Sequence, residues 1–388
     1  MSRKRIGILT GGGDVPGLNA CMRTFTMRAL DDGHEVIGIR RGWGGLIDVR
    51  PGDSRSEAEH LLELKRIDVR AIDRTGGTFL HTSRTNPMKI RRKDLPDHYP
   101  PDLREGDPEQ KLDVTAETLR TIERLRLDHL VAIGGDDTLS FAVRLDREGV
   151  PIIAIPKTMD NDVHGTDYSI GFSTAVTRSV NFINDLRAPV GSHERIAVIE
   201  LFGRYSGETA LVSGYLSSAD RTLIAEVPFD LDRIASLLVA DKLANPSLYS
   251  ILVVSEGARP EGGMMVIGGE ADAFGHRKLG GIGDFLGNAI QARTGHEVMV
   301  QRLAYLMRSG PPDSLDRIVA NNFGGLAYES VQQGQTGLLT AIRGGRYTTV
   351  PVSMVTEGRR QVDVAELYDP VEYRPRVSQV LGKPMFLY

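Results

Sequence analysis

Near its N-terminus the chain reads Ile6-Gly7-Ile8-Leu9-Thr10-Gly11-Gly12-Gly13, an apolar run of strand length that ends in three glycines. Apolar residues at helical spacing follow from Leu18 to Leu30, and residues from Val36 to Ile39 have the pattern of a second strand. This order of strand, glycine turn, helix and strand predicts a βαβ unit. Such units place parallel strands side by side, so the opening of the chain predicts an α/β fold.

The same alternation continues along the chain. Further strands are predicted at His129–Ile133, Ile152–Ile155, Ile196–Leu201, Leu223–Val227 and Ile251–Val254. Helices are predicted at Leu112–Leu127, at Thr174–Leu186 and at Leu231–Leu243, and another helix is predicted to begin at Thr138. Asp113 is the predicted N-cap of the first of these helices. Sheets of this kind bind ligands beyond the C-terminal ends of their strands. The unusual sequences lie at those ends: Gly11–Gly13, Gly134–Thr138, Pro156–Asp162, Phe202–Arg204 and Glu256. We therefore predict one cleft that gathers them.

Composition narrows the class of protein. With 388 residues the chain exceeds the roughly 250–300 residues of a single core, so two domains are expected. A net charge of −4 does not favour nucleic-acid binding, and no apolar run approaches the roughly 18 residues of a membrane span. The single cysteine, Cys21, excludes an intrachain disulfide and favours a cytoplasmic location. Segments 46–70 and 86–110 are rich in charge and are predicted as surface excursions, and the tail beyond about 358 shows no clear period until Val380.

The glycine loop has two interpretations. Small residues after a strand let backbone N–H groups approach an anion, and the following helix N-terminus favours negative charge. The loop lacks the Gly-Lys-Ser/Thr of a phosphate-binding P-loop, and Pro16 occupies the third glycine position of the dinucleotide fingerprint, which weakens a dehydrogenase interpretation. The alternative is a tight turn without a ligand.

Two acidic loops follow later strands. Gly134-Gly135-Asp136-Asp137 suits a magnesium ion bound together with substrate phosphates, or simple helix capping. In Pro156-Lys157-Thr158-Met159-Asp160-Asn161-Asp162 a carboxylate could accept a proton from a hydroxyl and Lys157 could neutralise a phosphate. The alternative for this loop is an Asp-Asn-Asp turn whose side chains bond their own backbone.

Several arginines could bind phosphate oxygens. Arg204 follows a predicted strand, Arg84 ends a Gly-Gly-Thr-Phe-Leu-His-Thr-Ser-Arg stretch, and Arg308 lies three residues after Tyr305. A planar guanidinium matches phosphate geometry. Each could equally be a solvated surface residue, and the histidines show no metal-ligand spacing.

Taken in order, these motifs resemble the 6-phosphofructokinase family from residue 6 to about residue 330. The most specific block is Gly165-Thr166-Asp167-Tyr168-Ser169-Ile170-Gly171-Phe172. The resemblance implies two Rossmann-like three-layer α/β/α domains with the active site in the cleft between them. It also implies a phosphoryl-donor domain of residues 1–170 plus about 308–358, and a sugar-phosphate domain of about 171–307 plus 359–388.

The resemblance further implies roles for single residues, with Mg²⁺ as cofactor. On the donor side, Gly12 resembles the glycine that contacts the donor phosphates, Arg84 the arginine near the transferred group, and Asp136 the magnesium ligand. Asp160 resembles the general base at the 1-hydroxyl of fructose 6-phosphate, with Asp162 as a supporting carboxylate. The implied substrate-binding residues are Thr158, Asp160, Arg195, Phe202, Gly203, Arg204, Glu256, Arg302, Tyr305 and Arg308. Arg195 resembles an arginine that reaches a neighbouring subunit, so a homodimer or homotetramer is expected.

Two positions bear on the phosphoryl donor. Where Asp137 and Lys157 stand, ATP-using members have glycine, and pyrophosphate-using members have Asp and Lys. A carboxylate at Asp137 would occupy the space of the nucleotide α-phosphate and repel it. Lys157 would stabilise the phosphate that leaves pyrophosphate. The sequence thus predicts a pyrophosphate-dependent enzyme.

Some positions depart from the family pattern. Phe202 replaces a usual methionine, Tyr305 a common histidine, and Met299 an expected arginine, with Arg302 three positions away. These changes lie on the acceptor side, so another sugar phosphate, such as sedoheptulose 7-phosphate, stays open. The remaining alternatives are an ATP-dependent kinase and a non-catalytic sensor of sugar phosphates or nucleotides, and the latter would need no general base.

Overall fold

The computed structural model describes residues 3–263, 267–271, 277–279, 281–376 and Leu381. The chain forms two compact units, both of α/β architecture as predicted. Unit 1 comprises Met1–Thr158, Val163–Gly171 and Gly310–Arg359, and unit 2 comprises Met159–Asp162, Phe172–Ser309 and Arg360–Tyr388. The sequence analysis kept all residues up to 170 in one domain, whereas the contacts assign the short stretch Met159–Asp162 to unit 2.

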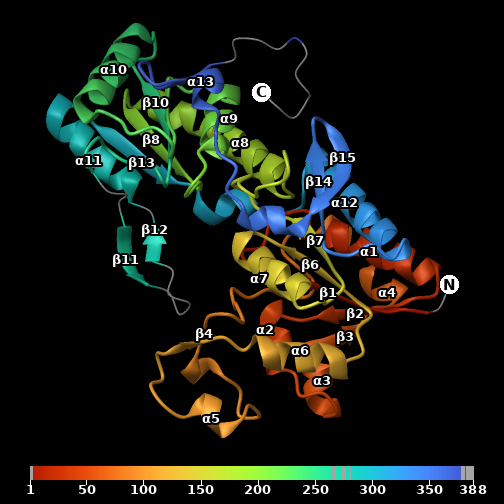
Figure 1. Ribbon diagram of the computed structural model, residues 1–388. Coiled ribbons are helices and arrows are strands. Elements are labelled where there is room, and N and C mark those ends of the chain that lie inside the picture. The colour runs from red at the N-terminus through yellow and green to blue at the C-terminus, as the bar shows by residue number, and fades with distance from the viewer. Residues whose placement is uncertain (1–2, 264–266, 272–276, 280, 377–380, 382–388) are drawn as a thin grey trace. The chain divides into compact units, whose positions relative to one another are not determined.

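Unit 1 is built on a seven-stranded sheet with the order β15-β14-β7-β6-β1-β2-β3 (Figure 1). The strands are β1 (Arg5–Thr10), β2 (Glu35–Ile39), β3 (Leu61–Glu63), β6 (His129–Gly134), β7 (Ile152–Pro156), β14 (Leu338–Arg343) and β15 (Arg346–Pro351). The strands from β14 to β2 are parallel, and β15 and β3 are antiparallel edges. The four strands predicted in the first 155 residues are therefore neighbours, and their C-terminal ends share one edge of the sheet.

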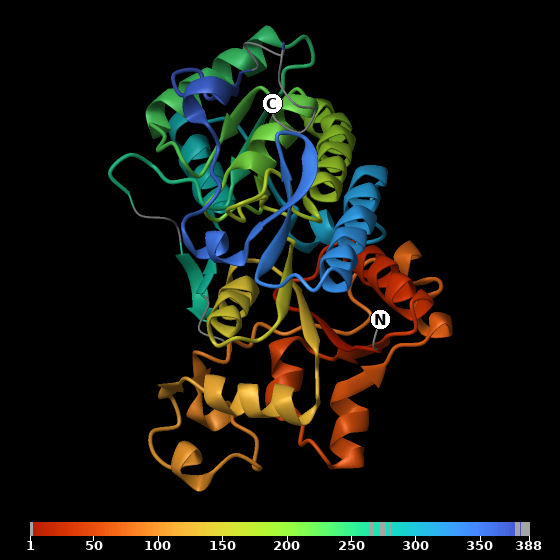
Figure 2. The same ribbon diagram turned by 45° about the vertical axis from the view of Figure 1, so that its right-hand side comes forward.

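Helices cover both faces of this sheet. Helices α1 (Leu18–Asp31) and α12 (Ser314–Gln332) pack side by side, as the red and blue helices in Figures 1 and 2 show. Their close approach requires Gly324, because a Cβ there would lie 2.5 Å from the carbonyl oxygen of Cys21. Helices α2 (Trp43–Asp48), α6 (Thr115–Arg124) and α7 (Asp136–Arg147) share an apolar core with Leu9. Ile8, which alternates with Leu9 along β1, is also fully buried, so the strand is covered on both faces.

The prediction for segment 46–70 is wrong in part. Leu46, Ile47 and Val49 are buried, and β3 adds an edge strand to the sheet. The many charged residues of this segment lie on the exposed sides of short elements, so the buried apolar residues between them were not recognised from the sequence. The other short elements of unit 1 are α3 (Ser54–His60), α4 (Arg66–Val69), β4 (Ile90–Arg91), α5 (Pro101–Arg104) and β5 (Lys111–Leu112), and 3-10 turns at Ile72–Arg74, Arg92–Asp94 and Val352–Thr356.

The helix predicted from Leu112 starts at Thr115, because Leu112 pairs with Ile90 as part of β5. Asp113 lies where a cap was predicted, and its carboxylate accepts the backbone N–H of Thr115 at 2.9 Å.

Unit 2 contains a parallel four-stranded sheet with the order β13-β8-β10-β9. Its strands are β8 (Ile196–Leu201), β9 (Arg221–Leu223), β10 (Ser250–Ser255) and β13 (Val298–Arg302). Its helices are α8 (Phe172–Ser192), α9 (Glu208–Leu216), α10 (Leu231–Ala244) and α11 (Ile282–Thr294), with a 3-10 turn at Ala304–Arg308 and a hairpin of β11 (Ile267–Ala271) and β12 (Arg277–Leu279). The strand predicted at Leu223–Val227 ends at Leu223 and starts at Arg221, a buried arginine that the apolar pattern did not include.

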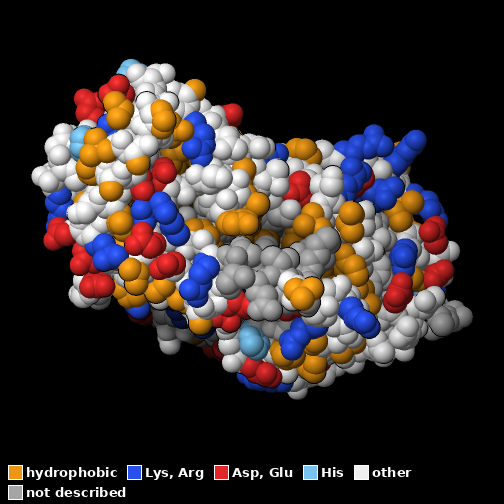
Figure 3. All heavy atoms as spheres, turned by 90° about the horizontal axis from the view of Figure 1, so that it is seen from above, with side chains coloured by type: hydrophobic (Ala, Val, Ile, Leu, Met, Phe, Trp, Pro, Cys, Tyr) orange, Lys and Arg blue, Asp and Glu red, His pale blue; other side chains and the backbone are white. Residues whose placement is uncertain are grey.

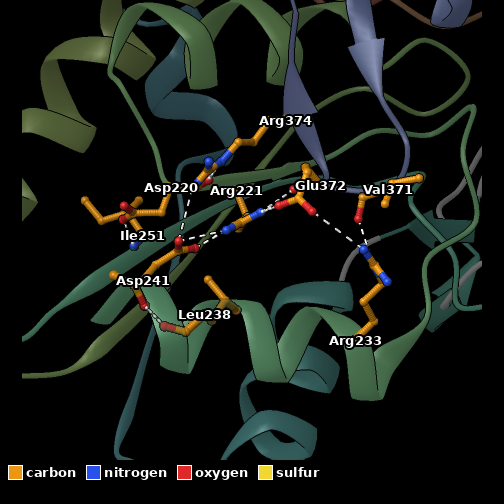
Figure 4. Close-up of polar contacts among 10 residues, drawn as sticks. Asp220, Arg221, Arg233, Leu238, Asp241, Ile251, Val371, Glu372 and Arg374 are labelled. Carbon is orange, nitrogen blue, oxygen red and sulfur yellow. Dashed lines mark hydrogen bonds and ion pairs between the residues drawn. The ribbon is translucent and has the colours of Figure 1, made fainter. Parts of the chain in front are cut away.

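A buried ion-pair network explains how Arg221 occupies a strand (Figure 4). Its guanidinium forms a fork with the carboxylate of Asp241, at 2.5 and 2.8 Å, and donates to the carboxylate of Glu372 at 2.7 Å. Arg374 also donates to Asp241, at 3.1 Å. The network thereby fastens the C-terminal part of the chain to the sheet of unit 2.

The C-terminal segment beyond about residue 358, in which the sequence shows no clear period until Val380, forms regular structure next to these ion pairs. It forms α13 (Val364–Leu367), β16 (Tyr368–Asp369) and β17 (Arg374–Pro375). Tyr368 and Tyr373 are buried in the apolar core of unit 2, and the Tyr368 hydroxyl donates to the carbonyl of Thr222 at 2.6 Å.

Acidic and basic side chains both occur across the face shown in Figure 3. Among the described residues, no helix has the length and apolar character needed to cross a bilayer.

Candidate active site

In unit 1, three neighbouring strand ends meet at the glycine loop. After β1, Gly11 donates its N–H to the carbonyl of Ile133 in β6, and Gly12 donates to the carbonyl of Ser83, both at 2.9 Å. Gly12 has a φ of 80°, a left-handed conformation that favours glycine. A Cβ at Gly11 would lie 2.5 Å from Oγ1 of Thr138. Glycine is therefore required for the loop to lie this close to the start of α7.

Lys157 follows β7 and reaches the same loop. Its side chain is buried, and its ammonium Nζ donates to the carbonyl of Gly13 at 2.6 Å. Its backbone N–H donates to the carbonyl of Gly134, which ends β6. A Cβ at Gly12 would lie 3.2 Å from Nζ. The cation is thus held at the point where β1, β6 and β7 end, close to the backbone of Gly12 and Gly13.

The two acids after Gly134-Gly135 occupy the first turn of α7, which begins at Asp136 rather than at Thr138. Carboxylates are favoured there by the positive end of the helix dipole. Asp137 is exposed, and Asp136 accepts a bond at 3.2 Å from Nε of Arg359. Arg359 was not singled out from the sequence, because it lies in a stretch without a motif.

Arg84 is placed by the loop that precedes it. Thr82 donates its hydroxyl to the carbonyl of Gly12 at 2.7 Å, and the Ser83 carbonyl accepts the Gly12 N–H. These two bonds tie the segment to the glycine loop. Arg84 itself is exposed.

In unit 2, the predicted residues gather at the C-terminal ends of β8 and β10. Gly203, after β8, has a φ of 136°, and its carbonyl accepts the hydroxyl of Ser255 at 2.5 Å. The backbone N–H of Arg204 points at the carboxylate of Asp160, with 3.5 Å between N and Oδ2. Phe202-Gly203-Arg204 and the acidic loop are therefore neighbours, although they are distant in sequence.

Two buried carboxyl groups near Arg204, those of Asp160 and Glu256, have raised pKa values. Burial raises the pKa of Asp160 well above its usual range, the nearby carboxylates of Asp162 and Glu256 raise it further, and Arg204 opposes the shift. Burial likewise raises the pKa of Glu256 to about 7, again opposed by Arg204. A buried carboxylate with a raised pKa is a better proton acceptor, which is the property that a general base needs.

An aromatic pair lies near this group. The rings of Phe202 and Tyr305 are 6.0 Å apart in an edge-to-face arrangement, and the guanidinium of Arg308 lies 4.6 Å from the centre of the Tyr305 ring. Tyr305 is 61% exposed, which leaves its hydroxyl side accessible to a ligand. Arg302, in contrast, pairs with Asp284 and lies 3.8 Å from Glu200, so its charge already has carboxylate partners.

Arg195 stands apart from these residues. It precedes β8, whereas Phe202 follows it, so a strand of roughly 20 Å separates the two ends. Arg195 pairs with Glu297 at 2.7 Å. Within one chain, Arg195 and Arg204 therefore lie at opposite ends of β8.

Glu208 and Arg360 also contact the acidic loop and were not singled out from the sequence. Glu208 accepts a bond from the Asn161 side chain at 3.2 Å, and Arg360 donates to the Asn161 carbonyl at 3.2 Å. Neither residue belongs to a recognisable motif.

Comparisons with known proteins point to one family. A family model described as phosphofructokinase matches residues 5–331. The pyrophosphate–fructose 6-phosphate 1-phosphotransferase of Amycolatopsis mediterranei is 38% identical over 95% of this chain and 98% of its own length. That of Dictyoglomus thermophilum is 37% identical over 96% of this chain and 99% of its own. An ATP-dependent 6-phosphofructokinase of Chloroflexus aggregans is 37% identical over 90% of both chains.

Solved structures support the fold. A pyrophosphate-dependent phosphofructokinase from Nitrosospira multiformis superposes with a TM-score of 0.75 at 17% identity, covering 100% of this chain and 96% of its own. One from Marinobacter aquaeolei gives a TM-score of 0.72 at 18% identity, covering 98% of this chain and 97% of its own.

Proposed function

This chain belongs to the phosphofructokinase family, and we propose that it is a pyrophosphate-dependent member. It reversibly transfers a phosphoryl group from pyrophosphate to the 1-hydroxyl of fructose 6-phosphate, giving fructose 1,6-bisphosphate and phosphate. Relatives of this name match nearly the whole chain at 37–38% identity. The observation that favours pyrophosphate over ATP is the buried Lys157 ammonium at the glycine loop, together with Asp137 two residues after the Gly-Gly turn.

On the donor side, Lys157 offsets the charge of the phosphate that leaves. Its ammonium is already desolvated and fixed by Gly13, so little reorganisation is needed when charge develops. Gly12 keeps the approach to this ammonium open, and Arg84 adds positive charge near the transferred group. Asp137 repels the additional phosphate of a nucleotide, which selects against ATP.

The carboxylates fit a magnesium ion shared with the substrate. Magnesium is usually held by one or two protein carboxylates plus substrate phosphates rather than by a full protein cage. Among the described residues there is no cluster of three or more His, Cys, Asp or Glu side chains, whereas Asp136 and Asp137 lie together in the first turn of α7. Asp136 would hold the ion, which when bound neutralises charge on the donor oxygens.

On the acceptor side, Asp160 accepts the proton of the 1-hydroxyl. Its raised pKa makes it a stronger base than an exposed carboxylate, and Asp162 contributes to that shift. Thr158 and Glu256 bind sugar hydroxyl groups, Arg204 binds the sugar phosphate substrate, and Tyr305 and Arg308 hold the 6-phosphate. Positioning and electrostatics account for the rate, as phosphoryl transfer generally requires.

We propose that the enzyme works in the cytoplasm as a homodimer or homotetramer, with Arg195 reaching the acceptor site of a neighbouring subunit. The position of Arg195 at the opposite end of β8 from Arg204 supports this assignment. Equilibrium sedimentation of the wild type and of Arg195→Ala tests it. We expect a dimer or tetramer in both cases and a raised KM for fructose 6-phosphate in the variant.

The function is tested by measuring sugar bisphosphate formation with pyrophosphate and with ATP, across fructose 6-phosphate and sedoheptulose 7-phosphate. We expect turnover with pyrophosphate and fructose 6-phosphate. Activity with ATP alone would refute the donor assignment. Preference for sedoheptulose 7-phosphate would refute the acceptor assignment. We would attribute such a preference to the residues around Phe202.

A further inference from the structure

The acidic loop contains a residue in an unusual conformation. Asn161, between Asp160 and Asp162, has a φ of 53° and is 1% exposed. A left-handed conformation is costly for residues other than glycine, and such residues persist only where their surroundings hold them. The conformation of Asn161 sets the directions in which the two flanking carboxylates point.

Unit 2 supplies the groups that hold this residue. The carboxylate of Glu208, at the start of α9, accepts a bond from Nδ2 of Asn161 at 3.2 Å and forms a buried ion pair with Arg360. The same guanidinium donates to the carbonyl of Asn161 at 3.2 Å, and the backbone N–H of Arg360 donates to the carbonyl of Asp162 at 3.0 Å.

A third anchor holds the residue before the base. The hydroxyl of Thr209, next to Glu208 in α9, donates to the carbonyl of Met159 at 2.7 Å. The backbone on both sides of Asp160 is therefore bonded to α9 or to the segment at Arg360. These bonds explain why Met159–Asp162 belongs to unit 2 although β7 belongs to unit 1.

From this geometry we propose that Glu208 and Arg360 are positioning residues for phosphoryl transfer. They act as one ion-paired clamp that fixes the backbone of Asn161 and so aims Asp160 at the hydroxyl that it deprotonates. This inference rests on the proposed role of Asp160 as general base. Arg360 lies beyond residue 331, where the match to the family model ends. The proposed clamp therefore uses a residue from the C-terminal part of the chain to position the catalytic loop.

The clamp differs from an ordinary structural ion pair in its expected effect on kinetics. Releasing the loop misplaces the Asp160 carboxylate, and a displacement of about 1 Å can lower turnover roughly 100-fold. It also changes the separation of Asp160 from Asp162, which contributes to the raised pKa of Asp160. Substitution of a residue that is needed only for stability would change neither the turnover number of the folded enzyme nor its pH profile.

The test compares Glu208→Ala, Arg360→Ala and the double variant with the wild type. We expect kcat to fall about 10- to 100-fold in each single variant, with KM for pyrophosphate changed less than about twofold. We expect the acid limb of the kcat profile to shift, and the double variant to be no worse than either single one, because the two residues act together. The control is Arg293→Ala, which removes an exposed arginine of unit 2 paired with Asp232, and it should retain wild-type kcat.

The conservative variants Glu208→Gln and Arg360→Lys keep the test decisive if the alanine variants do not fold. Glutamine retains an acceptor for Asn161, so Glu208→Gln should keep more activity than Arg360→Lys, whose ammonium cannot span Glu208 and the Asn161 carbonyl together. Folded variants with wild-type kcat and an unchanged acid limb would overturn the clamp. Failure of the wild type to form a bisphosphate from pyrophosphate would instead refute the proposed function, and the clamp would then be measured with ATP as donor.

Discussion

Glu256 offers a quantitative link between burial, charge and function. Burial raises its pKa from the ordinary value of 4.5 to about 7. The folded state therefore holds the proton more tightly than the unfolded state does. The stability that this provides is full below about pH 4.5 and is lost as the pH rises through about 7. Above that pH the folded protein contains an ionised, buried carboxylate.

The cost of this ionisation follows from the shift. One pKa unit corresponds to about 1.4 kcal/mol, so titration of Glu256 lowers the free energy of unfolding, relative to pH values below about 4.5, by about 1 kcal/mol at about pH 5.5 and by about 3 kcal/mol at about pH 8. At the lower of these two pH values only the unfolded state is ionised, and at the higher one the folded state is ionised as well. Glu256→Gln keeps the shape of the side chain without the charge. The variant should be more stable than the wild type by these amounts, with the larger gain at the higher pH.

Urea unfolding of both proteins at the two pH values measures the difference. Glu261→Gln, which removes an exposed carboxylate further along the same loop, is the control and should show no such gain. Glu256→Gln should also raise KM for fructose 6-phosphate by about tenfold, because a charged acceptor of a sugar hydroxyl is replaced by a neutral one. An equal stability change at both pH values, or a loss of stability at the higher one, would refute the reasoning.

Three further predictions concern other groups. Asp160→Asn should lower kcat by roughly 10²–10⁴, and an unchanged kcat in this variant would exclude Asp160 as the base. Because the Asp160 base must be ionised and its pKa is raised, the kcat of the wild type should begin to fall at a pH above the range in which an ordinary carboxylate titrates. Asp137→Gly combined with Lys157→Gly should lower kcat/KM for pyrophosphate by roughly 100-fold or more and should raise kcat/KM for ATP. Steady-state kinetics with each donor measures both values, and two unchanged values would argue against the donor assignment. Arg221→Met should reduce the free energy of unfolding by about 1.5–3 kcal/mol, because it removes the main partner of the partly buried Asp241 and leaves only the bond from Arg374. The exposed pair broken by Arg293→Met should cost about 1 kcal/mol or less in the same urea titration.

The α/β fold was predictable because its signal is local. Strands His129–Gly134 and Ile152–Pro156 are largely apolar runs, since both faces of the sheet are covered, and they end at a glycine and at a proline. The strand at Arg221 was misplaced for the opposite reason. Its first residue is charged, and only partners far along the chain, Asp241 and Glu372, make burial of that charge favourable.

The candidate site residues could be selected from the sequence where they lie in short motifs. Asp136, Lys157 and Asp160 each lie directly after a strand, so the sequence order and the topology of a parallel sheet placed them at strand ends. The residues that orient them were not predictable. Arg359 and Arg360 lie in a segment without period or motif, and their contacts with Asp136 and Asn161 span about 200 residues of sequence.

The account depends most on pyrophosphate as the phosphoryl donor. Radiolabelled pyrophosphate, incubated with fructose 6-phosphate, magnesium and the enzyme, tests it directly. We predict that the label divides equally between fructose 1,6-bisphosphate and inorganic phosphate, and that unlabelled ATP does not compete. Label found only in inorganic phosphate, or bisphosphate formed only when ATP is added, would contradict the account.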